Sequence, residues 1–187
     1  MTRICFIRHG ETDWNLAKRI QGSTDIPLNE TGRMQAEQCA AYLNAADYDV
    51  LIHSPLKRAK ETAEIINAKL QLPMVEMTDF QERSFGDGEG KTYAEREKHP
   101  DGFPNQEERA DFNKRVITAV EHVQQNYPDK RVLLVAHGAV INAILSVYSD
   151  GEIGSGKTTL LNACISNLHF EGDKWRIEDF NQVEHLS

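Results

Sequence analysis

The sequence has few cysteines and no long apolar run, and each shortage excludes a class of protein. Only three cysteines occur in 187 residues. They are odd in number and lie far apart in apolar or amphipathic stretches, which argues against a disulfide framework or a metal motif. We therefore predict reduced core residues at Cys5, Cys39 and Cys164. No stretch of about 18 apolar residues is present, and the N-terminus lacks the pattern of a signal peptide. We expect a soluble, cytoplasmic protein without a membrane partner.

Positive charge is also scarce. The chain carries 21 Lys and Arg residues against 29 Asp and Glu residues, a formal net charge of −8. Duplex binding requires a basic surface that neutralises several phosphates, so this balance argues against a nucleic-acid partner. A small anion is still compatible with a local basic pocket. The composition, 40% hydrophobic and 27% charged, is otherwise typical of one globular domain, which we expect to span residues 1–187.

Strand and helix patterns alternate along the chain. Apolar runs predict strands at residues 4–7, 49–53, 73–80 and 131–136, followed by a hairpin of 163–170 and 174–180. Apolar residues at helical spacing predict helices over 31–46, 54–70 and 139–148, and two helical pieces within 92–126 that are broken near Pro100 to Pro104. Ser54 is expected to cap the second helix and Pro55 to open it. This order predicts an α/β fold, with a mostly parallel sheet and one antiparallel strand.

Two of the predicted strands end in a histidine followed by a glycine. Residues 4–7 lead into Arg8-His9-Gly10-Glu11-Thr12, and residues 132–136 lead into His137-Gly138. In an open α/β sheet, ligands bind in the crevice beyond the carboxyl ends of the strands, so the two histidines can share one pocket. The arginine beside His9 makes an anion the expected ligand. Polar residues also follow two other predicted strands: Ser54-Pro55-Leu56-Lys57-Arg58 and Glu82.

These residues match the pattern of a known family. The segment Arg8-His9-Gly10-Glu11-Thr12, with Asn15, resembles the signature of the histidine phosphatase superfamily, also called phosphoglycerate mutase-like. Further family-like segments follow in order along the whole chain: 28–33 with Gln35-Ala36, 54–62, Glu82 with Phe85-Gly86 and Glu89-Gly90, and 136–138. The resemblance implies a three-layer αβα sandwich, no metal and no cofactor. It also implies a covalent phosphohistidine on His9, as in the broad-specificity phosphatases of the family.

The chemistry of phosphoryl transfer gives a reason for each residue type. A neutral imidazole is a competent nucleophile near pH 7, and its second nitrogen is expected to donate to a backbone carbonyl that fixes the tautomer. We therefore predict His9 as the nucleophile. Arg8 and Arg58 offer the planar paired donors that suit phosphate oxygens, and His137 and Asn15 offer further donors.

The leaving group needs a proton, which a carboxylic acid with a raised pKa can donate. The resemblance gives this role to Glu82, while Glu89, Asp87 and Glu11 are nearby acidic alternatives. The remaining predicted binding positions are Gln21, Gly22 and Gly138.

A cofactor-dependent phosphoglycerate mutase is the main alternative to a phosphatase. Mutases of the family usually carry additional chain between the loop of the predicted acid, here Glu82, and the second histidine, here His137. This chain has only a short polar segment there. Its residues 104–108, Pro-Asn-Gln-Glu-Glu, depart from the Gly-Glu-Ser type frequent in the family, which leaves the contacts on the substrate side open.

Two other phosphate chemistries have a weaker basis in the sequence. Residues 151–158 match the G-x-x-x-x-G-K-T pattern of a nucleotide-binding loop, but the pattern requires a preceding strand and a following helix, and neither is predicted. A metal site on His9 and His137 lacks any supporting ligand spacing. The prediction is therefore a phosphomonoester hydrolase acting on a small molecule. The sequence specifies neither its ester nor its oligomeric state.

Overall fold

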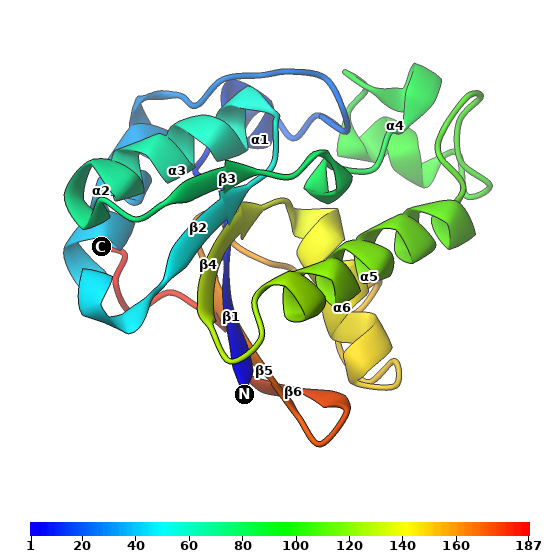
Figure 1. The fold of residues 1–187 in the computed structure, drawn as a ribbon. Helices are drawn as coiled ribbons and strands as arrows, with labels where there is room; N and C mark the ends of the chain where they lie inside the picture. The colour runs from blue at the N-terminus through cyan, green and yellow to red at the C-terminus, as the bar shows by residue number, and fades with distance from the viewer.

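The computed structural model describes residues 1–187 and has a six-stranded sheet at its centre (Figure 1). The strand order is β3-β2-β4-β1-β5-β6. The strands are β1 (Thr2–Arg8), β2 (Val50–His53), β3 (Met74–Glu76), β4 (Arg131–Ala136), β5 (Ile165–Glu171) and β6 (Lys174–Gln182). β1 to β4 pair in parallel, β5 is antiparallel to β1, and β6 is antiparallel to β5. Only β5 therefore runs against the other strands, which confirms the predicted mixed sheet.

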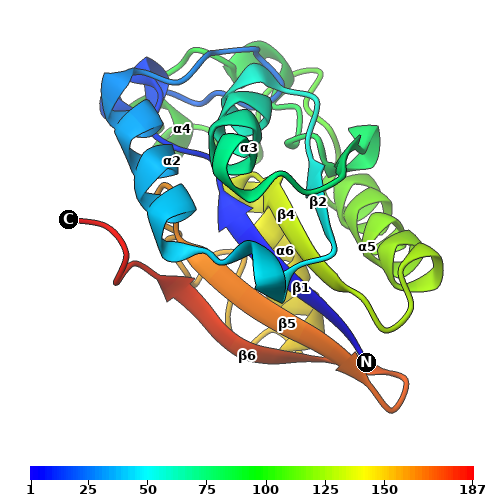
Figure 2. The same ribbon diagram turned by 60° about the vertical axis from the view of Figure 1, so that its left-hand side comes forward.

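Helices cover both faces of the sheet, as Figure 2 shows. Helices α2 (Glu30–Tyr42) and α3 (Lys57–Leu70) pack on one face, and α5 (Arg109–Asn126) and α6 (Gly138–Tyr148) pack on the other. Two short helices, α1 (Asp13–Leu16) and α4 (Tyr93–Glu97), lie beyond the carboxyl ends of the parallel strands. The implied three-layer αβα sandwich is confirmed. None of these helices is both long and apolar enough to cross a membrane.

The central strands divide the core into two halves. Ile4 and Phe6 of β1 belong to the half under α5 and α6, whereas Cys5 and Ile7 belong to the half under α2 and α3. Successive side chains of a strand point to opposite faces, so a strand that is buried on both faces needs an unbroken apolar run. The runs that predict β1 and β4 are therefore a direct consequence of their position between two helix layers.

All three cysteines are buried and unpaired, as predicted. Burial raises the pKa of the Cys5 and Cys39 thiols to about 12, and that of Cys164 to about 11. The thiolate is the reactive form of cysteine, so these side chains behave as small apolar core residues at neutral pH.

Helix α3 starts later than predicted. Its N-cap is Leu56, no side chain caps it, and the prediction that Ser54 caps the helix and Pro55 opens it is wrong. The Ser54 hydroxyl lies 2.7 Å from Nε2 of His137 instead, although it also accepts from the backbone N–H of Leu56. The predicted helix over 31–46 likewise ends early, at Tyr42, and a separate 3₁₀ turn follows at Ala45–Asp47.

Candidate active site

Three parallel strands deliver polar residues to one edge of the sheet. Arg8 ends β1 and pairs in register with Ala136, the last residue of β4. The backbone N–H of His9 donates to the carbonyl of Ala136 at 3.0 Å, so His9 and His137 follow adjacent strands at the same level. Their ring centroids are 5.3 Å apart and both side chains are buried. The structure therefore brings together the two histidines that the sequence places 128 residues apart.

His9 is held as a neutral imidazole with one free nitrogen. Its Nδ1 lies 2.7 Å from the carbonyl oxygen of Gly10, and because a carbonyl only accepts, Nδ1 carries the hydrogen and Nε2 carries the lone pair. Burial, together with the positive charges of Arg58 and Arg8, holds the pKa of His9 well below its usual value. A Cβ on Gly10 would lie 2.4 Å from the carbonyl oxygen of Gly32, so only glycine fits beside the histidine.

Two guanidinium groups flank the imidazoles. Arg58, the second residue of α3, is 1% exposed and donates to the carbonyls of Gly22 and Thr24 at 2.6 and 2.7 Å. Arg8 donates to the carbonyl of Leu160 at 2.5 Å. The Nε atoms of both arginines are buried without a partner. Burial lowers the pKa of Arg58 to about 10, opposed by Glu82, so the group stays charged at neutral pH. Unpartnered cationic donors in a buried site favour an anion.

His137 offers a further unpartnered nitrogen. Its Nε2 is taken by the Ser54 hydroxyl, whereas its Nδ1 is buried and has no partner. Burial and the nearby Arg58 lower the pKa of His137 well below its usual value. Gly138 follows as the first residue of α6, where a Cβ would lie 3.2 Å from Nε of Arg8. The predicted binding residues His137 and Gly138 therefore lie next to the arginine donors.

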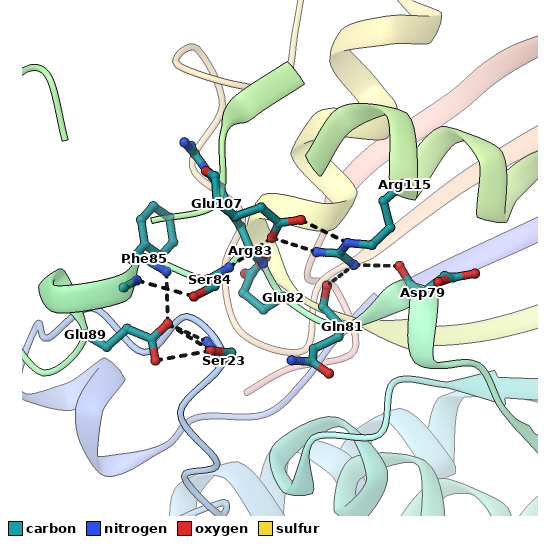
Figure 3. Close-up of polar contacts among 11 residues, drawn as sticks. Ser23, Asp79, Gln81, Glu82, Arg83, Ser84, Phe85, Glu89, Glu107 and Arg115 are labelled. Atoms are coloured by element: carbon teal, nitrogen blue, oxygen red, sulfur yellow. Dashed lines mark hydrogen bonds and ion pairs between the residues drawn. The ribbon is translucent and has the colours of Figure 1, made fainter. Parts of the chain in front are cut away.

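Glu82 is a partly buried carboxyl group in the loop drawn in Figure 3, and it lines the same cavity. Its Oε1 accepts from the backbone N–H of Arg83 at 3.0 Å, and its Oε2 accepts from the backbone N–H of Ala139 at 3.1 Å. Loss of solvent raises the pKa of Glu82, although these two hydrogen bonds and the charge of Arg58 oppose the rise. The environment thus shifts Glu82 toward the protonated form relative to a free glutamate, and this is the form that can donate a proton.

The three acidic alternatives to Glu82 have other partners, and none of them lines the cavity. Glu89 accepts hydrogen bonds from Ser23, Thr24 and Phe85; these bonds outweigh the effect of its partial burial and lower its pKa. Glu11 accepts from Asn29, and Asp87 accepts from Asn105. Geometry therefore favours Glu82 among the four carboxylates.

The predicted binding residues of the first loop also line the cavity. Asn15 closes a capping box with Thr12 at the start of α1, and Gln21 accepts from the Thr12 hydroxyl at 2.6 Å. Gly22 has a φ of +54°, which glycine adopts without strain, and its carbonyl accepts from Arg58. One contributor was missed by the sequence analysis: Asn162 donates from Nδ2 to the carbonyl of His9 at 3.2 Å and to Oδ1 of Asn15 at 3.1 Å.

The cavity has a volume of about 390 Å³ and a second group of arginines on its outer wall. Arg83, Arg96 and Arg109 line this wall, and the guanidinium carbons of Arg83 and Arg96 lie 5.2 and 4.8 Å from the ring centroid of Phe85. Arg109 and Arg96 both lower the pKa of Arg83, after the larger effect of its burial. Three like charges therefore lie close together on one part of the cavity wall.

Residues 151–158 do not form a nucleotide-binding loop. They are turns that follow helix α6 and precede β5, without the strand before and the helix after that such a loop requires. Ser155 and Gly156 lie on the rim of the cavity, and Lys157 donates to the carbonyl of Gly151. Nowhere in the chain do three His, Cys, Asp or Glu side chains converge as a set of metal ligands.

The three-layer fold, together with paired histidines and arginines beyond the carboxyl ends of its strands, defines an α/β enzyme of phosphoglycerate mutase-like architecture. Residues 4–183 match the histidine phosphatase superfamily, branch 1. The chain is 51% identical over 189 residues to the uncharacterized phosphatase PhoE of Bacillus subtilis, covering 100% of this chain and 98% of the relative. The chain belongs to the histidine phosphatase superfamily, and it is a phosphatase that acts through a phosphohistidine intermediate.

Solved structures give the same result for the fold. The chain superposes on Bacillus stearothermophilus YhfR with a TM-score of 0.91 at 27% identity, over 100% of both chains. It superposes on a phosphoserine phosphatase from Entamoeba histolytica in complex with 3-phosphoglyceric acid with a TM-score of 0.86 at 30% identity, again over 100% of both chains. Relatives of this chain thus bind small phosphorylated molecules.

Proposed function

We propose that this protein hydrolyses small phosphomonoesters with His9 as the nucleophile and Glu82 as the proton donor. One observation carries the proposal: His9, whose Nε2 is freed by the bond from Nδ1 to the carbonyl of Gly10, lines the same cavity as Arg8, Arg58 and Glu82, and the Nε atoms of both arginines are buried without a partner. Nucleophile, charge stabilisation and acid are therefore available to one bound phosphate.

In the first step, Nε2 of His9 attacks phosphorus as the bond to the ester oxygen breaks. The leaving oxygen takes the proton of Glu82, so the alcohol departs neutral. Charge in this transition state is spread over the three equatorial oxygens, and catalysis consists mainly of holding and stabilising them. The buried donors of Arg8, Arg58 and His137 that lack partners are suited to this task, and Asn15 adds an amide.

In the second step, water attacks the phosphohistidine. Glu82, now a carboxylate, takes a proton from the water as the oxygen–phosphorus bond forms and the nitrogen–phosphorus bond breaks. This returns a neutral His9 and a protonated Glu82 and releases inorganic phosphate. Two displacements replace one difficult step by two easier ones.

The outer wall of the cavity supports a leaving group that carries a second negative charge. The charges of Arg109 and Arg96 lower the pKa of Arg83, although Glu107 and Glu108 oppose this effect, and an anionic group bound between the three arginines relieves their repulsion. Phe85 and Phe112 line the same wall and suit the carbon skeleton between the two anionic groups. We infer that phosphorylated acids are preferred over phosphorylated alcohols of the same size.

The products formed from 3-phosphoglycerate distinguish a phosphatase from a mutase. We expect inorganic phosphate to be released and no 2-phosphoglycerate to form, because exposed side chains such as Tyr93 and Arg96 border the cavity and water can reach the phosphohistidine. Phosphate release and both isomers are measured on one sample, by colorimetry and phosphorus NMR. Isomerisation that outruns phosphate release would identify a mutase instead.

The preference for acidic leaving groups is tested with a matched pair of substrates. 3-Phosphoglycerate and glycerol 3-phosphate differ at one end, which is a carboxylate in the first and a hydroxymethyl group in the second. We expect kcat/KM to favour 3-phosphoglycerate, and the ratio to fall about tenfold in Arg109→Gln, which is the size of one charge-assisted hydrogen bond. Arg176→Gln, an exposed residue of β6 outside the cavity, serves as the control. An unchanged ratio of the two kcat/KM values in Arg109→Gln would show that the arginines do not recognise the charge of the leaving group.

A further inference from the structure

The segment that carries Glu82 has no regular structure of its own. It connects two 3₁₀ turns, η2 (Thr78–Phe80) and η3 (Gly86–Gly88), and contains neither helix nor strand. Such a segment lacks the repeated backbone hydrogen bonds that hold a strand or helix in place. The position of the Glu82 carboxyl therefore depends on what holds the chain on either side of it.

Arg115 of helix α5 holds the part before Glu82. Its Nη1 donates to the backbone carbonyls of Asp79 and Gln81, each at 2.8 Å (Figure 3). Gln81 is the residue immediately before Glu82, so one guanidinium nitrogen fixes the entry into the acidic position. A charged donor makes these bonds stronger than bonds between neutral groups.

Glu107 holds the part after Glu82. Its Oε1 accepts from the backbone N–H of Ser84 at 3.1 Å, and its own backbone N–H donates to the Ser84 carbonyl at 2.8 Å. Its carbonyl accepts from Nε of Arg83 at 2.9 Å. Residues 104–108, whose part in substrate contacts the sequence leaves open, do not line the cavity, and Glu107 faces the loop that carries Glu82.

A two-bond ion pair joins these two supports. Nε of Arg115 lies 3.1 Å from Oε2 of Glu107, and Nη2 lies 3.0 Å from Oε1, with side-chain exposures of 24% and 22%. A pair with two parallel hydrogen bonds defines an orientation, which a single contact does not. Both side chains are thus fixed relative to each other and to the backbone on both sides of Glu82.

We propose that this Glu107–Arg115 clamp positions Glu82 for proton transfer to the leaving group. The inference rests on the acid role of Glu82 proposed above. A donor must lie within about 2.6–3.2 Å of the oxygen that it protonates, so a small shift of an irregular loop is enough to remove proton transfer. Neither Glu107 nor Arg115 lines the cavity, and both are therefore positioning residues that act through Glu82. Phe112 and Arg109, about one and two turns before Arg115 on α5, do line it, so the same helix fixes the acid and the wall for the leaving group.

The experiment compares two leaving groups. Glycerol 3-phosphate leaves as an alkoxide and needs the proton, whereas p-nitrophenyl phosphate leaves as a stable phenolate and does not. We expect Arg115→Gln to lower kcat/KM for glycerol 3-phosphate about tenfold or more, a part of the roughly 10²–10⁴-fold that general acid catalysis contributes. The loss with p-nitrophenyl phosphate is expected to be much smaller, because kcat/KM reports the first displacement. Arg176→Gln is the matched arginine control.

Further variants separate positioning from charge and from folding. Arg115→Lys keeps the charge but not the planar pair of donors, and we expect it to show the same selective loss in weaker form. Glu107→Gln removes the ion pair from the other side and is used if Arg115→Gln lowers the Tm. In the double variant Glu82→Gln/Arg115→Gln, no loss beyond that of Glu82→Gln is expected, because both changes remove one function.

Equal losses for the two leaving groups, or additive losses in the double variant, would overturn the clamp. A selective loss in Glu82→Gln without one in Arg115→Gln would overturn the clamp alone. Absence of a selective loss in Glu82→Gln would overturn the acid role on which the clamp rests.

Discussion

Replacement of His9 by alanine is expected to reduce turnover by roughly 10⁴-fold or more, as the loss of a covalent nucleophile does in other enzymes. We expect no neighbouring group to substitute for it: Nε2 of His137 lies against the Ser54 hydroxyl, its Nδ1 is the nitrogen that we assign as a donor to phosphate, and the three thiols are buried and protonated. Phosphate release from p-nitrophenyl phosphate measures the loss. Tm measurement shows whether the smaller side chain has destabilised the fold.

The same variant tests the intermediate directly. Wild-type protein mixed with labelled substrate and quenched in alkali is expected to retain covalent phosphate that is released in acid, which is the stability of a phosphohistidine. His9→Ala is expected to retain none. His122→Ala, on an exposed position of α5, is the matched control and is expected to behave as wild type. Alkali-stable label on His9→Ala would assign the nucleophile to another residue.

Replacement of Glu82 by glutamine is expected to lower kcat/KM for glycerol 3-phosphate by about 10²–10⁴-fold, the contribution of a positioned general acid. Glutamine keeps the shape of the side chain and can still accept one of the two backbone hydrogen bonds from Arg83 and Ala139. Its amide hydrogens are too weakly acidic to be transferred to the leaving group. The loss therefore reports proton transfer, while p-nitrophenyl phosphate reports what remains of the site.

The pH dependence of kcat/KM gives the second readout for Glu82. His9 must be neutral, so activity falls as the pH drops through its lowered pKa; Glu82 must be protonated, so activity falls as the pH rises through its raised pKa. Burial moves the two pKa values in opposite directions, and both shifts widen the pH range in which neutral His9 coexists with protonated Glu82. In Glu82→Gln the alkaline fall is expected to disappear. An alkaline fall that persists in Glu82→Gln would assign the acid role to another group. Glu97→Gln, at an exposed position of α4, is the control.

Local patterns predicted the central strands β1, β2 and β4 well, because a strand that is buried on both faces requires an unbroken apolar run. The strand predicted over 73–80 is shorter, and β3 covers only Met74–Glu76. Local patterns failed where a tertiary contact competes with a local one. Ser54 has the sequence signature of a helix cap, but its hydroxyl lies against His137 and the helix starts at Lys57 instead. The four residues of α1 are too few for a periodic signal, and their capping box was not predicted.

The sequence by itself determined the residue types of the site and the edge of the sheet at which they meet. This is because a strand buried on both faces requires an apolar run, and the polar residues that follow such runs all emerge at one end of a parallel sheet. Only the tertiary structure decided which polar groups touch: Ser54 to His137, Asn162 to His9, and Glu107 with Arg115 around Glu82. These contacts join residues that are remote along the chain or lie in irregular loops. Sequence periodicity there does not indicate which residues are in contact.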